Sequence, residues 1–208
     1  MEQLVFPLAP TEPYGFRYFV PHSGVTAAYQ GLAELFQNFE KNPEKLFLAT
    51  VNGPKGSGKS HLIHAFAMRW RRSEHSSKVR VFDFAEVPDD GAAASLVAAY
   101  EELRRSGGVM LVALSSDLDN PKLTPHIASR LRTGELYSLS YPNEDELAPL
   151  VASLLERHNL QLSANSIAYL MKRLPRDPLS FDNIFAKISE SSLQQNKPAG
   201  MGVIRSVI

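Results

Sequence analysis

Residues 53–60 read GPKGSGKS, a complete match to the pattern G-x-x-x-x-G-K-[ST]. Glycines at these positions let backbone N–H groups turn inward around an anion, and a helix starting directly behind the loop adds positive potential at its N-terminus. The lysine of such a pattern reaches phosphate oxygens, and the hydroxyl that follows it is a ligand for Mg²⁺. The stretch therefore predicts a phosphate-binding loop, with a chance glycine-rich turn as the alternative.

The sequence on both sides of this loop favours phosphate binding. Residues 46–51 (LFLATV) form a continuous apolar run, typical of a strand buried on both faces of a parallel sheet, and residues 61–70 have a helical pattern. The loop therefore has the strand–loop–helix context that a nucleotide-binding loop requires. The candidate nucleotide-binding residues in this region are Gly53, Pro54, Lys55, Gly56, Ser57, Gly58, Lys59, Ser60 and His61.

Strand and helix patterns alternate up to about residue 141. Besides the elements next to the loop, the patterns predict strands at 79–84, 109–114 and 136–139, and helices at 23–39 and 91–105. Ser23 is the expected N-cap of the first of these helices. Alternation of this kind indicates right-handed crossovers and a parallel sheet, so the fold class is α/β.

From residue 142 onward the pattern is purely helical. Residues 143–146 form a capping box, Ser163 starts a second helix, and Asp177 caps a third. Pro178 then stands at the first helical position, where a missing N–H has no cost. The sequence predicts three parts: a proline-rich N-terminal arm (1–21), a nucleotide-binding α/β domain (22–141) and a small all-helical lid domain (142–208).

Composition excludes several classes of protein. The 208 residues include 22 basic and 22 acidic side chains, so no overall charge draws the chain to nucleic acid or to a membrane. Cysteine is absent, which excludes disulfides and thiolate metal sites. The first residues resemble no signal peptide, and no apolar run reaches membrane-spanning length. We expect a soluble, cytoplasmic protein.

A P-loop enzyme also needs a carboxylate at the end of a neighbouring strand to hold Mg²⁺ through water. Asp83, near the end of the strand at 79–84, is the candidate, together with Ser60 of the loop. The alternative is that Asp83 merely caps the following turn. The next residue is Phe84, at the position where a hydrolytic P-loop motor has a second acid that orients water. Glu86, two positions further on, is a weak candidate to replace that acid.

Three segments resemble the DnaA-like branch of the AAA+ proteins. They are SHLIHA at 60–65, YGFRYFV at 14–20 and PHIASRL at 125–131. Because the resemblance runs from residue 3 to the C-terminus, the match is closest to the Hda family of DnaA-related regulatory inactivators. It implies an AAA+ P-loop parallel sheet with a helical lid, and ADP or ATP as the ligand. It also implies nucleotide contacts from Phe19 and Val20 and sensor-like roles for Ser116 and Asp117.

In this family the arginine of the Ser-Arg-Leu segment is an arginine finger that acts on a neighbouring subunit. The matching residue here is Arg130, which the resemblance would make catalytic in trans. A finger supplies positive charge where the phosphoryl transition state develops negative charge. The alternative is an arginine in a surface salt bridge, our interpretation of Arg132.

The N-terminal segment resembles the short motif by which such proteins bind the DNA polymerase sliding clamp. Its amide and apolar anchors are Gln3, Leu4, Phe6 and Leu8. Six-residue patterns of this kind are common, and an N-terminal strand or ordinary arm is the alternative.

Two features depart from the family. Asp83 follows Lys59 by only 24 positions, so one strand–helix unit is absent, and we expect a sheet of four strands with 79–84 at its edge. The lid position that usually presents an arginine to the phosphates is Leu179, and Arg176 lies one turn away. Because Phe84 and Leu179 both stand where a catalytic polar group is expected, we expect the nucleotide to be held rather than rapidly hydrolysed.

Three functions remain open at this point. The first is a regulator that stimulates ATP hydrolysis by DnaA while attached to the clamp, and the second is an autonomous AAA+ ATPase or loader. The third, a DNA-binding replication factor, is disfavoured because residues 142–208 contain seven basic and seven acidic side chains. We expect no sequence-specific DNA binding and no membrane partner, and leave self-association open.

Overall fold

The computed structural model describes residues 15–70 and 75–208. Within them the chain forms two compact units. Residues 15–16 and 21–140 belong to an α/β unit, and residues 17–20 and 141–208 belong to a helical unit. The segment from Arg17 to Val20, assigned from sequence to the N-terminal arm, thus clusters with the C-terminal helices.

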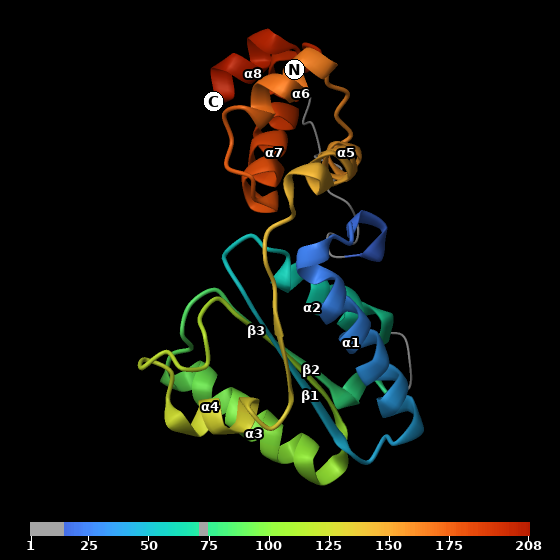
Figure 1. Cartoon of the computed structure of the whole chain (residues 1–208), viewed down its shortest axis with the longest axis vertical. Helices are drawn as coiled ribbons and strands as arrows, with labels where there is room; N and C mark the ends of the chain where they lie inside the picture. The colour runs from blue at the N-terminus through green and yellow to red at the C-terminus, as the bar shows by residue number, and fades with distance from the viewer. Residues whose placement is uncertain (1–14, 71–74) are drawn as a thin grey trace, which may run out of the picture. The chain divides into compact units, whose positions relative to one another are not determined.

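The α/β unit is built on one parallel sheet (Figure 1). Its strands are β1 (Leu46–Asn52), β2 (Val79–Phe84), β3 (Gly108–Leu114) and β4 (Glu135–Ser138). They lie in the order β2-β3-β1-β4, and β3 is buried along its whole length. The prediction of four strands with 79–84 at an edge is confirmed.

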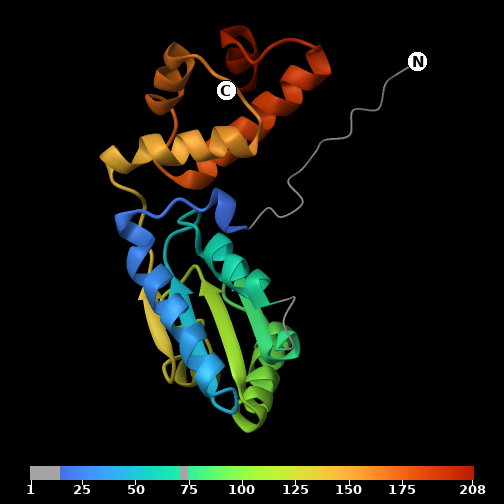
Figure 2. The same ribbon diagram turned by 90° about the vertical axis from the view of Figure 1, so that its right-hand side faces the viewer.

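Helices cover both faces of this sheet, as Figures 1 and 2 show. They are α1 (Ser23–Lys41), α2 (Lys59–Trp70), α3 (Asp90–Ser106) and α4 (Pro125–Leu131), with a short 3-10 turn at Ser76–Lys78. A further 3-10 turn, Phe16–Tyr18, contains residues of both units. On one face α1 and α2 meet through stacked rings, with Phe36 5.6 Å from Phe66 and 5.2 Å from Trp70. On the other face α3 and α4 bury leucine side chains against β1 and β3.

Two helix starts differ from the sequence predictions. Ser23 is not the N-cap of α1, because the extended His22 occupies that position and its carbonyl accepts from the N–H groups of Val25 and Thr26. Residues 125–131 form a helix that the hydrophobic pattern did not indicate. Its seven residues are too few to display helical periodicity.

Between residues 141 and 208 the helical unit contains a 3-10 turn and four helices. They are the turn Glu144–Glu146, α5 (Leu147–Arg157), α6 (Ala164–Met171), α7 (Pro178–Gln195) and α8 (Met201–Val207). The predicted caps are confirmed: residues 143–146 form the capping box, Ser163 accepts from Ser166 N–H, and Asp177 accepts from Ser180 N–H. The helix α8 was not predicted. Across the described ranges, no helix is both long enough and apolar enough to cross a bilayer.

Candidate nucleotide-binding site

The loop between β1 and α2 has the backbone conformation of a phosphate cradle. Gly53 and Gly58 have φ angles of +146° and +95°, which favour glycine. A Cβ atom on Gly53 would lie 2.6 Å from the Leu139 carbonyl oxygen, whereas one on Gly58 would meet nothing within 4 Å. The start of the loop is therefore packed against the chain after β4, while the space beside its last glycine is open to a ligand.

Lys59 is folded over this loop. Its ammonium group donates to the carbonyl oxygens of Gly53 (2.9 Å) and Pro54 (2.8 Å), and the residue is only 6% exposed. Burial lowers the pKa of Lys59 below its ordinary value, and the charge of Asp83 opposes this shift. A cation stripped of water in this way gains from an anionic partner, so a phosphate group at the loop would favour its charged form.

Asp83 lies at the carboxyl end of β2 and faces α2. Hydrogen bonds from His64 and Ser60, together with nearby positive charge, hold the pKa of Asp83 below its ordinary value against the effect of burial. His64 Nε2 lies 3.4 Å from Asp83 Oδ2. The fold thus brings together Ser60 and Asp83, the two residues expected to hold Mg²⁺. His64 was missed, although its position one turn after Ser60 places both side chains on the same face of α2.

No group of three or more His, Asp or Glu side chains in residues 15–70 and 75–208 is arranged to hold a metal. Mg²⁺ is usually bound by one or two protein oxygen ligands together with phosphate oxygens and water. Ser60 and Asp83 fit this pattern, so Mg²⁺ would bind here with a nucleotide rather than by itself.

A second polar group lies where β3, β1 and β4 end. Asn52 Nδ2 donates to Asp117 Oδ1 (2.9 Å), and the Ser138 hydroxyl donates to Asn52 Oδ1 (2.7 Å). Asp117, predicted to have a sensor-like role, is therefore held by the residue that directly precedes the P-loop. Asn52 and Ser138 were not among the sequence candidates, because 65 and 86 positions separate Asn52 from its two partners.

Two buried hydroxyl groups in this region have no hydrogen-bond partner in the described part of the chain. They belong to Ser57 in the loop and to Ser116 beside Asp117. A buried polar group without a partner costs about 1–3 kcal/mol, so such groups need a ligand or water to complete them. Their location at the carboxyl edge of the sheet fits a site that is completed by a bound polar molecule.

No protein-family model matches the chain. An uncharacterised protein of Haemophilus influenzae is 22% identical over 183 residues, covering 75% of this chain and 79% of that protein. Domain III of the replication initiation protein DnaA from Thermotoga maritima superimposes with a TM-score of 0.75 at 16% identity, covering 98% of both chains. AMPPCP-bound DnaA from Aquifex aeolicus gives 0.69 at 14% identity, covering 90% of this chain and 68% of that one.

The chain has a DnaA-like AAA+ fold. At these identities the similarity establishes the fold alone. The predicted AAA+ sheet with a C-terminal helical segment is thereby confirmed, while the finer family assignment stays a proposal.

Several of the predicted nucleotide contacts belong to the helical unit or make other contacts, and they stay predictions. Phe19 and Val20 belong to the helical unit, where Val20 packs against the hydrophobic core. His61 pairs through Nε2 with the carbonyl oxygen of Gly15 (3.0 Å), which ties α2 to the segment before α1. In the helical unit, Arg176 forms an ion pair with Glu144 at 2.8 Å. The clamp-motif candidates Gln3, Leu4, Phe6 and Leu8 lie outside the described residues.

Arg130 of the AAA+ unit lies against α3. Its Nε and Nη2 atoms donate to Glu101 Oε1 at 3.2 and 2.8 Å, and Nη1 donates to the His126 carbonyl oxygen at 3.0 Å. The guanidinium carbon lies 5.6 Å from the centre of the Tyr100 ring, and the side chain is 24% exposed. Arg132 is 47% exposed and contacts Asp119 at 2.6 Å. Arg130 is therefore a firmly anchored arginine, whereas Arg132 makes the surface pair expected of it.

Proposed function

We propose that this protein binds an adenine nucleotide with Mg²⁺ at residues 53–60 and regulates the ATPase reaction of a partner. Nucleotide binding is supported by the position of three residues, which lie together at the loop: Lys59, Ser60 and Asp83. Lys59 would contact the phosphate oxygens, and Ser60 and Asp83 would hold the metal, which neutralises phosphate charge when bound.

The environment of Asp83 supports slow turnover by the protein itself. Phe84, at the position of the expected second acid, stacks against Phe82 at 5.9 Å and packs into the hydrophobic core. The residue beside Asp83 is thus not a second carboxylate but His64, which contacts it at 3.4 Å. Without a second carboxylate to orient water, the site lacks one of the positioned groups on which phosphoryl transfer depends.

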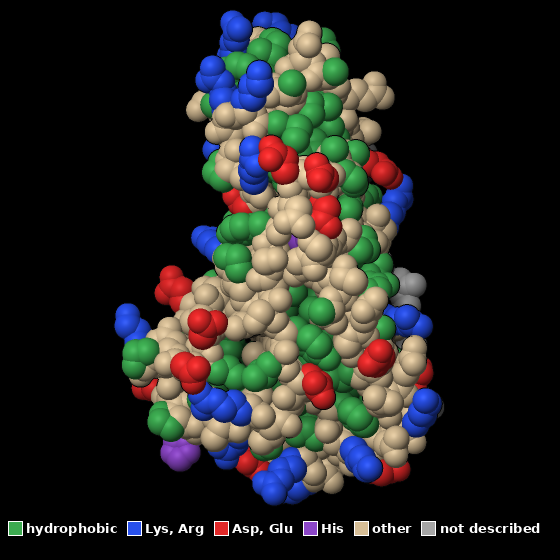
Figure 3. All heavy atoms as spheres, in the orientation of Figure 1, with side chains coloured by type: hydrophobic (Ala, Val, Ile, Leu, Met, Phe, Trp, Pro, Cys, Tyr) green, Lys and Arg blue, Asp and Glu red, His purple; other side chains and the backbone are tan. Residues whose placement is uncertain are grey.

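For the partner we propose DnaA, with hydrolysis of its ATP stimulated by Arg130 in trans and residues 3–8 binding the sliding clamp. This part rests on the resemblance of segments 60–65, 14–20 and 125–131 to DnaA-like proteins, and the DnaA-like fold supports it. On the lower part of the face that Figure 3 shows, over the α/β unit, basic and acidic side chains are interspersed, so this part of the surface offers no continuous basic patch to DNA.

The Glu101 contact limits how Arg130 can work. Both donors on one edge of the guanidinium group point to a single carboxylate oxygen, so that edge is not available to a phosphate in this conformation. A finger role requires a partner's phosphate to take over these donors or to use the remaining N–H groups. Glu101→Gln should therefore raise stimulation, because a neutral amide holds the guanidinium group less strongly than a carboxylate does.

The experiment follows ATP hydrolysis by ATP-bound DnaA after addition of this protein and DNA-loaded clamp. Arg130→Ala should abolish stimulation without affecting nucleotide binding, since fingers contribute roughly 10³–10⁵ in rate in GTPases. Arg130→Lys keeps a cation beside Glu101 but lacks the planar fork, so it should also fail. Arg132→Ala is the matched control and should stimulate normally.

Three results would count against this proposal. Normal stimulation by Arg130→Ala would exclude the finger, and no stimulation by wild type would exclude DnaA as the partner. Intrinsic turnover on the order of one per second or more would instead favour an autonomous ATPase or loader.

A further inference from the structure

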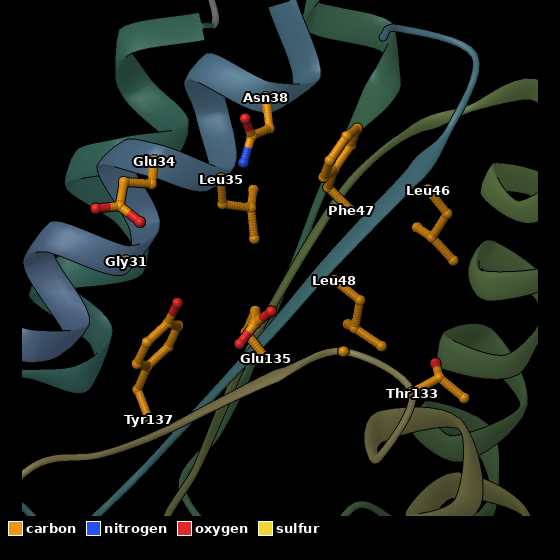
Figure 4. A pocket seen from close by; sticks show the side chains of 11 residues that line it. Gly31, Glu34, Leu35, Asn38, Leu46, Phe47, Leu48, Thr133, Glu135 and Tyr137 are labelled. Carbon is orange, nitrogen blue, oxygen red and sulfur yellow. The ribbon is translucent and has the colours of Figure 1, made fainter.

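A groove lies at the opposite end of the sheet from the P-loop. It has a volume of about 310 Å³ and is formed by α1, the start of β1 and the segment that leads into β4 (Figure 4). Its β1 residues are the first three of the strand, Leu46 to Leu48, whereas the P-loop follows the last residue of that strand. A strand rises about 3.3 Å per residue, so the length of β1 separates the two sites.

The α1 wall of the groove is one stripe of the helix. Gly31, Glu34, Leu35 and Asn38 follow the spacing i, i+3, i+4, i+7, which places all four on one face. Leu35 is 5% exposed and supplies apolar surface, whereas Glu34 and Asn38 are exposed. The wall therefore combines a hydrophobic base with polar groups near solvent.

Tyr137 on β4 lies directly against this helix. A Cβ atom on Gly31 would be 2.0 Å from the tyrosine hydroxyl oxygen, so the ring occupies the place of a missing helix side chain. Glycine within a helix costs about 0.5–1 kcal/mol relative to alanine. This close approach makes Gly31 and Tyr137 a matched pair that closes one end of the groove.

The groove is acidic and its charges are uncompensated. Its lining includes Glu34 on α1 and Glu135 on β4 but no basic side chain. Neither carboxylate has an ion-pair partner among the residues the structure describes, and the Tyr137 hydroxyl has no hydrogen bond there. Burial raises the pKa of Tyr137, and the charges of Glu135 and Glu34 raise it further. These charges disfavour an anionic ligand such as a nucleotide in this groove.

We propose that this groove binds an aliphatic cation, an alkylammonium or alkylguanidinium group whose stem packs on Leu35 and Leu48. The volume of about 310 Å³ lies at the lower end of the range typical of small-molecule sites. Glu34 and Glu135 supply the negative charge, and Asn38 and Tyr137 offer oxygen acceptors for N–H donors. A free diamine and a lysine or arginine side chain of a partner protein share this chemistry.

The test is an NMR titration of the ¹⁵N-labelled full chain. The probes are 1,5-diaminopentane, N-acetyl-lysine methylamide and N-acetyl-arginine methylamide, with neutral 1,5-pentanediol as the matched control. The cations should produce saturable shifts at the amides of Gly31, Leu35 and Glu135, whereas the diol should not. Tighter binding of the diamine identifies a free polyvalent cation as the ligand, and equal or tighter binding of a methylamide identifies a protein side chain.

Two pairs of substitutions that change the net charge equally test whether the cation binds in the groove. The double substitution Glu34→Gln and Glu135→Gln should weaken binding by at least about tenfold, because it removes both charges that face the cation. Glu40→Gln with Glu44→Gln makes the same change in net charge on exposed residues that do not line the groove, and should bind as wild type does. Equal losses in both pairs, or no saturable shift with any cation, would overturn the proposal. Nucleotide affinity should be unchanged in every variant, which separates this test from that of the P-loop.

Discussion

At its carboxyl end, strand β1 leads into the P-loop, where a buried lysine and unpartnered hydroxyl groups suit a phosphate. At its amino end, the same strand forms the floor of a groove lined by two carboxylates and no basic side chain. Both sites depend on glycines, but for different reasons. In the P-loop Gly53 and Gly58 supply backbone angles, whereas Gly31 supplies the space for a tyrosine ring. If both proposals hold, one strand carries two sites whose ligands have opposite charge.

The largest effect is expected at the P-loop. Lys59→Ala should weaken binding of Mg²⁺-nucleotide by roughly 100-fold or more, since each charge-assisted hydrogen bond contributes about 1.5 kcal/mol or more. Calorimetry with ADP and ATP measures this, and Lys45→Ala on the exposed segment before β1 is the control. Equal affinities of Lys59→Ala and wild type would remove the nucleotide site from the comparison.

The next effect is a pH dependence at the same edge of the sheet. The pKa of Asp83 is below its ordinary value of 3.8, so its contribution to stability is complete above that value. It is lost as the pH falls through the lower pKa of the folded protein. The difference in unfolding free energy between wild type and Asp83→Asn should shrink as the pH falls from about 5 towards 3. Urea denaturation at each pH in this range measures it, and a difference that grows between pH 5 and pH 3 would contradict this assignment.

At the groove, Gly31→Ala tests the pairing of a glycine with a tyrosine. The added methyl group must displace the end of the Tyr137 side chain, while alanine favours the helix by up to about 1 kcal/mol. Because these effects oppose each other, we expect a change in stability within about 1 kcal/mol and loss of cation binding. Gly91→Ala in α3, where an added Cβ has no contact shorter than 3.5 Å, should only stabilise. Thermal unfolding measures the change in stability, and the NMR titration measures cation binding. Unchanged cation binding by Gly31→Ala would contradict the pairing of Gly31 with Tyr137.

The smallest effect concerns the ionisation of Tyr137. Burial raises its pKa first, and Glu135 and Glu34 raise it further. The double substitution Glu34→Gln and Glu135→Gln should therefore lower this pKa towards, but not to, the ordinary value of 10.0. Ultraviolet titration of the variant against the same variant carrying Tyr137→Phe isolates this one phenol. An unchanged pKa would show that the carboxylates point away from the groove.

The sequence by itself determined the parts of this protein that depend on neighbouring residues. Residues 53–60 predicted the P-loop because the glycines that set its backbone conformation and the side chains expected to contact phosphate belong to one continuous stretch. The spacing between Lys59 and Asp83 predicted a four-stranded sheet with 79–84 at its edge. The caps at Ser163 and Asp177 were predictable because a cap acts within three residues of itself.

Only the tertiary structure decided which distant side chains meet. Arg130 contacts Glu101 across 29 positions, and Asn52 joins Asp117 and Ser138 at the ends of three strands. The groove likewise exists because Gly31 of α1 is brought against Tyr137 of β4. These contacts depend on strand order and on the packing of helices over the sheet. Local sequence patterns do not specify either of these, because a short segment has the same pattern whichever distant segment it packs against.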